Sequence, residues 1–151
     1  PYGRGGSPIQ NLIKRGYTSS PVCALSMSDG IDSGPIYDQL DISLEGNLSE
    51  ILIRLNKAVN LLIERLIKNL PEPKEQNGEV KIFKRLSHKD NEISMDASFE
   101  EFYNKIRMLD DSSYPNAYLK LENTIIEFSE ISKVSDEIFC KVRIASKGTE
   151  E

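Results

Sequence analysis

The sequence contains little of the chemistry that metal sites and disulfide frameworks need. It has one histidine and two cysteines among 151 residues. Cys23 and Cys140 lie far apart inside apolar stretches, which is typical of small hydrophobic side chains in a reducing compartment such as the cytoplasm. No apolar run reaches the roughly 20 residues that a membrane-spanning helix needs. We therefore expect neither a metal site nor a membrane association.

Positive charge is also scarce, because the formal net charge is −5 and the densest basic stretch is Lys81–Arg85. A domain that binds nucleic acid through its phosphates usually has a basic face. The sequence therefore does not favour a tight nucleic-acid binder. It also lacks an initiator methionine and a signal-peptide pattern. We expect a fragment of a longer cytoplasmic protein.

Residues 1–70 have the pattern of an α/β unit. Ser7 and Pro8 favour a helix start with Ser7 as the cap, and the apolar spacing predicts that this helix ends at Gly16. A strand is predicted over residues 18–27. Because its apolar residues do not alternate strictly, we expect it to be buried on both faces, as in a parallel sheet. Helix followed by buried strand is typical of α/β folds.

A loop rich in glycine, aspartate and serine follows at residues 28–35, and residues 35–42 alternate as an edge strand does. Asn47 is placed to cap a long helix, with Glu50 completing a capping box. A broad apolar stripe predicts that this helix continues to just before Pro71.

Residues 71–97 are polar and rich in helix breakers, which predicts a linker with a brief strand at residues 80–83. The closing residues 146–151 are expected to form a frayed tail.

Residues 98–145 predict a small α+β module. Ser98 and Glu101 form a second capping box, which starts a helix with aromatic residues on one face. Three strands then follow, at residues 117–121, 124–131 and 138–144, the first two forming a hairpin. One helix is thus expected to precede a small antiparallel sheet.

Three segments occur in a suggestive order. They are Arg4-Gly5-Gly6-Ser7-Pro8-Ile9-Gln10-Asn11, then Asp29-Gly30-Ile31-Asp32-Ser33-Gly34-Pro35-Ile36, and finally Ile106-Arg107-Met108-Leu109-Asp110 followed by Tyr114-Pro115-Asn116-Ala117-Tyr118. They resemble, in turn, the Arg-Gly-x-x-Pro segment, the Asp-[Thr/Ser]-Gly loop and the Ile-Arg…Tyr-Pro-Gly-Ala stretch of formyltetrahydrofolate-dependent formyltransferases. This family includes methionyl-tRNA formyltransferases and amino-sugar N-formyltransferases.

The resemblance implies an α/β fold: the C-terminal portion of a Rossmann-like formyltransferase domain, followed by a small α+β module. It also implies 10-formyltetrahydrofolate as cofactor and a primary amine as acceptor. In the family, catalysis belongs to an Asn-x-His pair and a downstream aspartate, which Asp32 matches. The sequence contains no Asn-x-His. We therefore expect residues 1–151 alone to be inactive, and the residues that bind the cofactor stay unassigned.

The reaction that the resemblance implies gives a chemical reason for an aspartate at position 32. An amine that attacks a formyl amide passes through a tetrahedral oxyanion, which an imidazolium and an amide donor stabilise. A carboxylate beside the histidine raises the histidine pKa and orients the ring. The ordinary alternative is an aspartate that hydrogen-bonds its own turn, and Asp29 fits that role better.

The segment Arg4, Gly5 and Gly6 is the predicted substrate-binding element, because glycines allow close approach and arginine binds anions as a fork. Its alternative is a flexible terminus. His88 lies in a polar stretch and is expected to be a solvated loop residue that cannot replace the catalytic histidine.

Two questions about function stay open at this level. The C-terminal module is short and not basic, which favours a small-molecule acceptor, a nucleotide-linked amino sugar, over methionyl-tRNA. A second hypothesis, from a different functional class, is a non-catalytic binding or dimerisation module. In it, the apolar stripe of the long helix that begins near Leu48 forms the interface of a homodimer.

Overall fold

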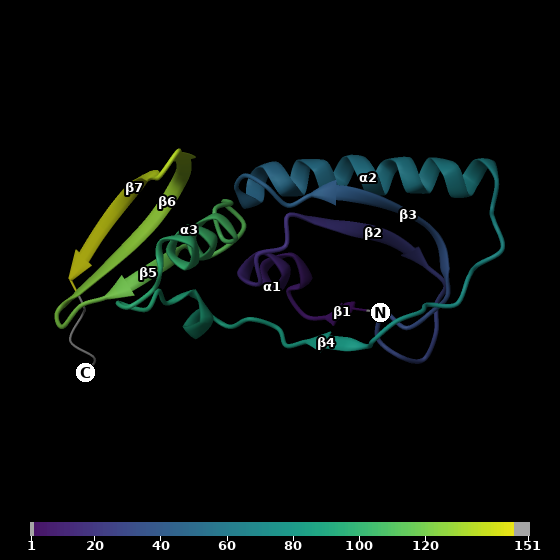
Figure 1. The fold of residues 1–151 in the computed structure, drawn as a ribbon, viewed down its shortest axis with the longest axis horizontal. Helices are drawn as coiled ribbons and strands as arrows, with labels where there is room; N and C mark the ends of the chain where they lie inside the picture. The colour runs from purple at the N-terminus through teal and green to yellow at the C-terminus, as the bar shows by residue number, and fades with distance from the viewer. Residues whose placement is uncertain (1, 147–151) are drawn as a thin grey trace. The chain divides into compact units, whose positions relative to one another are not determined.

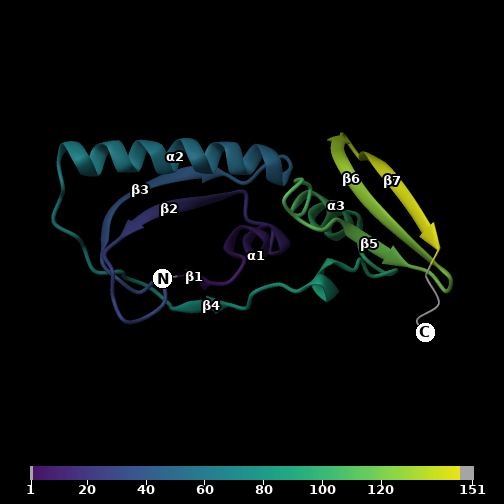
Figure 2. The same cartoon turned by 180° about the vertical axis from the view of Figure 1, so that it is seen from behind.

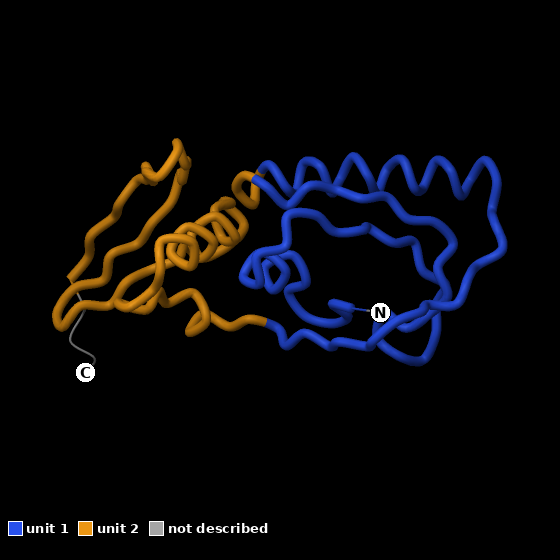
Figure 3. Tube along the Cα trace, in the orientation of Figure 1, with its two compact units in different colours: residues 1–45, 50–85 blue, residues 46–49, 86–151 orange. Residues whose placement is uncertain are grey.

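The computed structural model describes residues 2–146, which divide into two compact units (Figure 3). The first unit comprises residues 1–45 and 50–85, and the second comprises residues 46–49 and 86–151. The predicted linker, residues 71–97, is therefore shared between the units, with Arg85 in the first and Leu86 in the second.

The first unit contains four strands and two helices among its described residues (Figure 1). They are β1 Tyr2–Gly5, α1 Pro8–Lys14, β2 Ser19–Leu25, β3 Ile36–Ser43, most of α2 Leu48–Lys68, and β4 Lys81–Phe83. The strands form two separate pairs, β1 with β4 and β2 with β3.

Helix α1 lies where the sequence predicts it, with Pro8 in its first turn. The predicted role of Ser7 is wrong in its detail. Ser7 has a left-handed backbone (φ 47°), and its side chain makes no capping hydrogen bond. The fixed φ of proline suits the first helical position, so this start does not depend on a side-chain cap.

Strands β2 and β3 form an antiparallel ribbon that pairs Ser19 with Ser43 and Val22 with Leu40. The prediction of a strand buried on both faces of a parallel sheet is therefore wrong. The loop at residues 26–35 returns the chain directly alongside itself, whereas a parallel partner would need a crossover of a dozen or more residues. Most side chains of β2 are only half-buried.

A parallel pairing does occur, between β1 and β4 (Figure 2). Gly5 pairs with Phe83 and Arg4 with Ile82. The brief strand predicted at residues 80–83 is confirmed as β4. The alternative of a flexible terminus does not hold for residues 2–5, because β1 pairs with a strand far along the sequence. The described residues contain no larger parallel sheet of the Rossmann kind.

Helix α2 is confirmed as the long helix that begins after Asn47. It is tied to β3 by Arg54, whose Nε donates to the Ser43 carbonyl at 3.0 Å, and by an ion pair between Arg65 and Asp38 at 3.4 Å. The buried apolar residues of the first unit are Leu12, Ile13, Ile42, Leu44, Ile51, Ala58, Leu62 and Phe83.

The second unit has the predicted order of one helix followed by three antiparallel strands. Its elements are a short 3-10 helix His88–Asn91, α3 Phe99–Arg107, β5 Ala117–Lys120, β6 Thr124–Val134 and β7 Glu137–Ser146. The sheet order is β5-β6-β7. Phe102 of α3 meets Phe128 of β6 edge to face at 5.3 Å between ring centroids, which joins the helix to the sheet.

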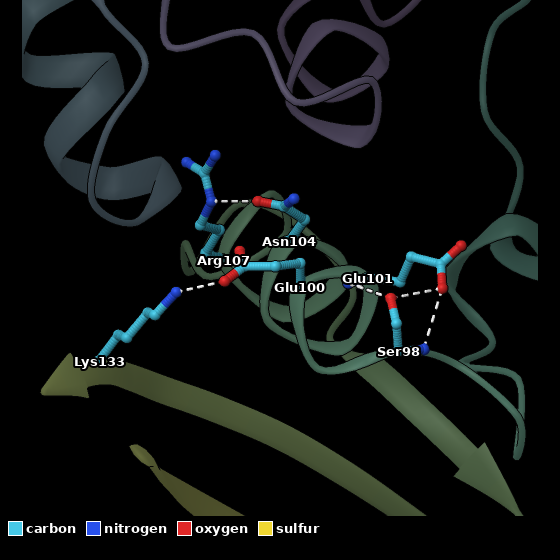
Figure 4. A network of polar contacts seen from close by, with 6 residues as sticks. All are labelled: Ser98, Glu100, Glu101, Asn104, Arg107 and Lys133. Carbon is cyan, nitrogen blue, oxygen red and sulfur yellow. Dashed lines mark hydrogen bonds and ion pairs between the residues drawn. The ribbon is translucent and has the colours of Figure 1, made fainter. Parts of the chain in front are cut away.

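The capping box at the start of α3 is confirmed (Figure 4). Glu101 N donates to Ser98 Oγ at 3.3 Å, and Ser98 N donates to the Glu101 carboxylate at 2.9 Å. Two donors that a helix start leaves unpaired are thereby satisfied.

Strand β6 carries a β-bulge between Ser129 and Ser132, where Glu130 has φ 52°. Of the predicted tail at residues 146–151, Ser146 ends β7 and residues 147–151 lie outside the described residues. Among the described residues, no helix is long and apolar enough to cross a membrane.

Candidate functional site

The glycines after Arg4 allow two stretches of backbone to lie in contact. Gly5 has φ 99°, which a residue with a side chain rarely adopts, and Gly6 N donates to the Phe83 carbonyl at 3.0 Å. A Cβ on Gly6 would lie 2.5 Å from Arg85 Cα. Only glycine fits at position 6. Gly5 and Gly6 together therefore fix the backbone path at the end of β1 and the direction of the Gly5 amide.

The loop at residues 26–35 is closed by its own backbone. Ser26 N donates to the Pro35 carbonyl at 2.8 Å, and the hydroxyls of Ser28 and Ser33 lie 2.8 Å apart. Gly34 is buried, and a Cβ there would lie 1.8 Å from the Ser26 carbonyl oxygen. The loop is therefore a defined structure rather than an open excursion.

Asp32 is brought to the glycine segment by this loop. Its Oδ2 accepts a hydrogen bond from Gly5 N at 3.0 Å, and its backbone is left-handed with φ 50°. Aspartate tolerates that conformation better than most residues do. Among the described residues, its other carboxylate oxygen, Oδ1, accepts no hydrogen bond, and the side chain is exposed.

Sequence reasoning missed the residue that joins these two segments. Gln76 Oε1 accepts from Arg4 Nη2 at 2.8 Å and from Arg4 Nε at 3.3 Å. Gln76 Nε2 donates to the carbonyls of Asp32 at 2.9 Å and Gly34 at 2.7 Å. A glutamine in a polar, breaker-rich stretch carries no sequence signal for such contacts.

These groups line a cavity of about 280 Å³ in the first unit. Its walls are Tyr2, Gly3, Arg4, Pro8, Pro21, Cys23, Leu25, Asp32, Ile36 and Gln76. One carboxylate, one guanidinium and one carboxamide thus lie among apolar side chains. A few polar groups in an apolar concavity are the usual composition of a small-molecule site.

Cys23 lines the same cavity. The side chain is half-buried, where the sequence predicted a buried hydrophobic residue, and burial raises the pKa of its thiol. The reactive form of cysteine is the thiolate, which a raised pKa makes scarcer. The described residues contain no group of three or more histidine, cysteine, aspartate or glutamate side chains that could bind a metal.

His88 is exposed, and its ring stacks on Tyr118 at 5.0 Å between centroids. Both residues belong to the second unit, whereas Asp32 belongs to the first.

The third motif segment has a structural role in the second unit. Buried Arg107 donates to the Gly46 carbonyl at 3.1 Å and to Asn104 Oδ1 at 2.7 Å. Asp110 is only 8% exposed, and its carboxylate accepts the amides of Glu130 at 2.8 Å and Ile131 at 2.9 Å. Asp110 therefore holds the bulge of β6.

Comparisons with known proteins agree with this architecture. Residues 88–145 match the model of the family described as methionyl-tRNA formyltransferase, C-terminal domain. A methionyl-tRNA formyltransferase structure from Clostridium thermocellum is 39% identical, with a TM-score of 0.91 over 97% of this chain and 65% of that one. A methionyl-tRNA formyltransferase from Campylobacter lari is 33% identical over 89% of this chain and 44% of its own length.

The fold also occurs in an N-formyltransferase from Helicobacter canadensis, solved in complex with folinic acid and dTDP-3-aminofucose. That protein is 19% identical, with a TM-score of 0.64 over 97% of this chain and 62% of that one, and this likeness concerns the fold alone.

A mixed α/β first unit, joined in sequence to a small helix-and-sheet unit, is the architecture that the chain shares with the methionyl-tRNA formyltransferase structure. The chain belongs to the formyltransferase family. It spans about half the length of the curated relatives that it matches, 44% and 49% for the first two.

Proposed function

We propose that the protein containing this chain transfers a formyl group from 10-formyltetrahydrofolate to a primary amine. The observation that carries this proposal is the contact between the Asp32 carboxylate and the Gly5 amide, beside Arg4, in a cavity of the first unit. Family membership supports it independently.

Asp32 is the proposed catalytic residue of this chain. One carboxylate oxygen is fixed by the Gly5 amide, while Oδ1 accepts no hydrogen bond from the described residues. A carboxylate held in this way can orient an imidazole and favour its protonated form. His88 stacks on Tyr118 and is not assigned that role. We therefore propose that residues 1–151 alone lack the acid–base group and do not catalyse transfer.

The cavity that this chain forms is small. At about 280 Å³ it lies below the usual range of about 300–1,000 Å³ for sites that enclose drug-sized ligands. It fits a reacting end, where the formyl carbon of the donor meets the acceptor amine. Arg4 would bind the substrate there through its guanidinium, and Gly5 and Gly6 would complete the element through their backbone, which packs closely against Phe83 and Arg85.

We propose methionyl-tRNA as the acceptor. The C-terminal family model and the relatives at 33% and 39% identity are all methionyl-tRNA formyltransferases. The short, weakly basic C-terminal module favours a nucleotide-linked amino sugar instead, and the protein from Helicobacter canadensis was solved with such a ligand at 19% identity. The methionyl-tRNA formyltransferase structure is 39% identical over 97% of this chain, so it supports methionyl-tRNA more strongly than the 19% identical protein supports an amino sugar.

The acceptor is tested with the complete gene product that contains this chain. The purified protein is incubated with 10-formyltetrahydrofolate and either methionyl-tRNA or a dTDP-amino sugar, and formylated product is measured by mass spectrometry. Product from methionyl-tRNA alone supports the proposal. Product from the sugar alone reverses the acceptor, and no product from either refutes formyl transfer to these amines.

The alternative of a dimerisation module has one observation in its favour. Helix α2 and the residues just after it leave Val59, Ile63, Ile67 and Leu70 exposed at helical spacing, with Ile67 80% exposed. Light scattering after size exclusion tests this alternative: it requires a dimer that an Ile63→Glu, Ile67→Glu double variant makes monomeric.

A further inference from the structure

We propose that Gln76 is a positioning residue for the transfer reaction: its carboxamide holds the Arg4 guanidinium and the Asp32 loop in one fixed arrangement. This inference rests on the proposed function. Gln76 lies between α2 and β4 in the sequence and lines the cavity together with Arg4 and Asp32.

The hydrogen-bonding capacity of the Gln76 amide is fully used. A glutamine side chain offers two acceptor sites on its oxygen and two N–H donors. Here the oxygen accepts both Nε and Nη2 of Arg4, and the nitrogen donates to the carbonyls of Asp32 and Gly34. A flipped amide would set N–H groups against the guanidinium and an oxygen against two carbonyls. Only one orientation of the side chain satisfies all four partners.

The backbone that carries Gln76 is itself anchored. Lys74 and Ile36 exchange two backbone hydrogen bonds, with Ile36 N donating at 2.7 Å and Lys74 N at 2.8 Å. Ile36 begins β3, directly after the loop that contains Asp32. Gln76 therefore reaches the loop from a segment that is paired to the end of that same loop.

The Asp32 loop has reason to need such a clamp. Asp32 occupies a left-handed backbone conformation, which local sequence alone does not enforce. Gln76 binds the carbonyl of Asp32 itself and the carbonyl of Gly34, two residues later. They set the plane of the backbone from which the carboxylate projects. Because a displacement of about 1 Å of a reacting group can reduce the rate about 100-fold, the clamp bears on rate rather than on affinity.

Two substitutions separate the two ends of the amide. Gln76→Met retains the length of the side chain and removes every hydrogen bond. Gln76→Glu retains an acceptor for Arg4 but has no N–H for the two loop carbonyls. Asn77→Met is the matched control, since Asn77 is the exposed neighbour in the same segment.

The variants are made in the complete gene product and assayed for formyl transfer to methionyl-tRNA. We expect Gln76→Met to lower kcat about 10- to 100-fold, with KM for the formyl donor changed less than about threefold and with the melting temperature of the control. In hydrogen–deuterium exchange, peptides covering residues 26–35 should exchange faster in Gln76→Met and in Gln76→Glu than in Asn77→Met.

The outcomes are distinguishable. An active wild type with equal kcat in Gln76→Met and Asn77→Met overturns the positioning role. A loss of activity that is explained by a lowered melting temperature also overturns the positioning role, because it is a structural effect. If Gln76→Met does not fold, the transfer rate and the exchange of residues 26–35 are compared between Gln76→Glu and Asn77→Met instead. A wild type that transfers no formyl group overturns the proposed function and the positioning role of Gln76 with it, whatever the exchange data show.

Discussion

The two units use an aspartate in opposite ways. In the second unit, buried Asp110 uses both carboxylate oxygens to accept backbone amides. In the first unit, exposed Asp32 uses one oxygen on the Gly5 amide, and Oδ1 accepts none from the described residues. A carboxylate whose bonds are complete stabilises a fold, whereas one with an oxygen left over in a cavity is available to a ligand.

The largest effect on stability should come from Asp110→Ala. This change leaves two amides of the β6 bulge without an acceptor, and we expect a loss of about 3 kcal/mol in the free energy of unfolding. Urea unfolding followed by circular dichroism measures it. Glu137→Ala removes an exposed carboxylate on β7 and is the control. Equal losses of unfolding free energy in the two variants would show that the Asp110 carboxylate does not stabilise the fold, and the contrast with Asp32 would then fail.

In the first unit, the close contact of Gly34 should matter more than any side chain of its loop. Gly34→Ala places a Cβ 1.8 Å from the Ser26 carbonyl oxygen, and the resulting overpacking should cost about 2 kcal/mol. Gly30→Ala meets only the movable Ser33 side chain and should cost less. Thermal unfolding compares the pair, and an unaffected Gly34→Ala protein would show that the loop is not rigid.

The smallest effect concerns pH and the capping box of α3. Hydrogen bonds from the Ser98 hydroxyl and amide lower the pKa of Glu101. A carboxyl whose pKa is lower in the folded state adds stability above its unfolded pKa, about 4.3, and loses it as the pH falls through the folded pKa. The melting temperature of the wild type should therefore exceed that of Glu101→Gln at pH 7, and the difference should shrink towards pH 3. A constant difference contradicts this assignment.

Local sequence patterns predicted much of the second unit, because a capping box marks the start of its helix and alternating apolar residues mark its strands. Ser98 with Glu101 marked a helix start, and the alternation of Ile138, Cys140 and Val142 marked a strand. The contacts of the first unit were harder to predict from the sequence. The pairing of β1 with β4 and the bridge from Gln76 to Arg4 join residues far apart in sequence, and no periodicity records such contacts.

Of the candidate site, Asp32, Arg4, Gly5 and Gly6 were predicted from the motifs that resemble the family. The structure places Asp32 and Arg4 in the lining of one cavity, and the Gly5 amide donates to the Asp32 carboxylate. Their functional roles stay predictions. Gln76 could not be predicted because its stretch has no motif, and the antiparallel direction of β2 was missed because lack of alternation does not distinguish a half-buried ribbon from a parallel sheet.

The central claim is that Asp32 acts in chemistry rather than in folding. Asp32→Asn and Asp29→Asn in the complete gene product give the most direct test, with formyl transfer and urea unfolding measured on the same preparations. We predict that Asp32→Asn lowers kcat about 100-fold or more while the free energy of unfolding stays within about 1 kcal/mol of that of Asp29→Asn. Equal transfer rates in the two variants would contradict the account.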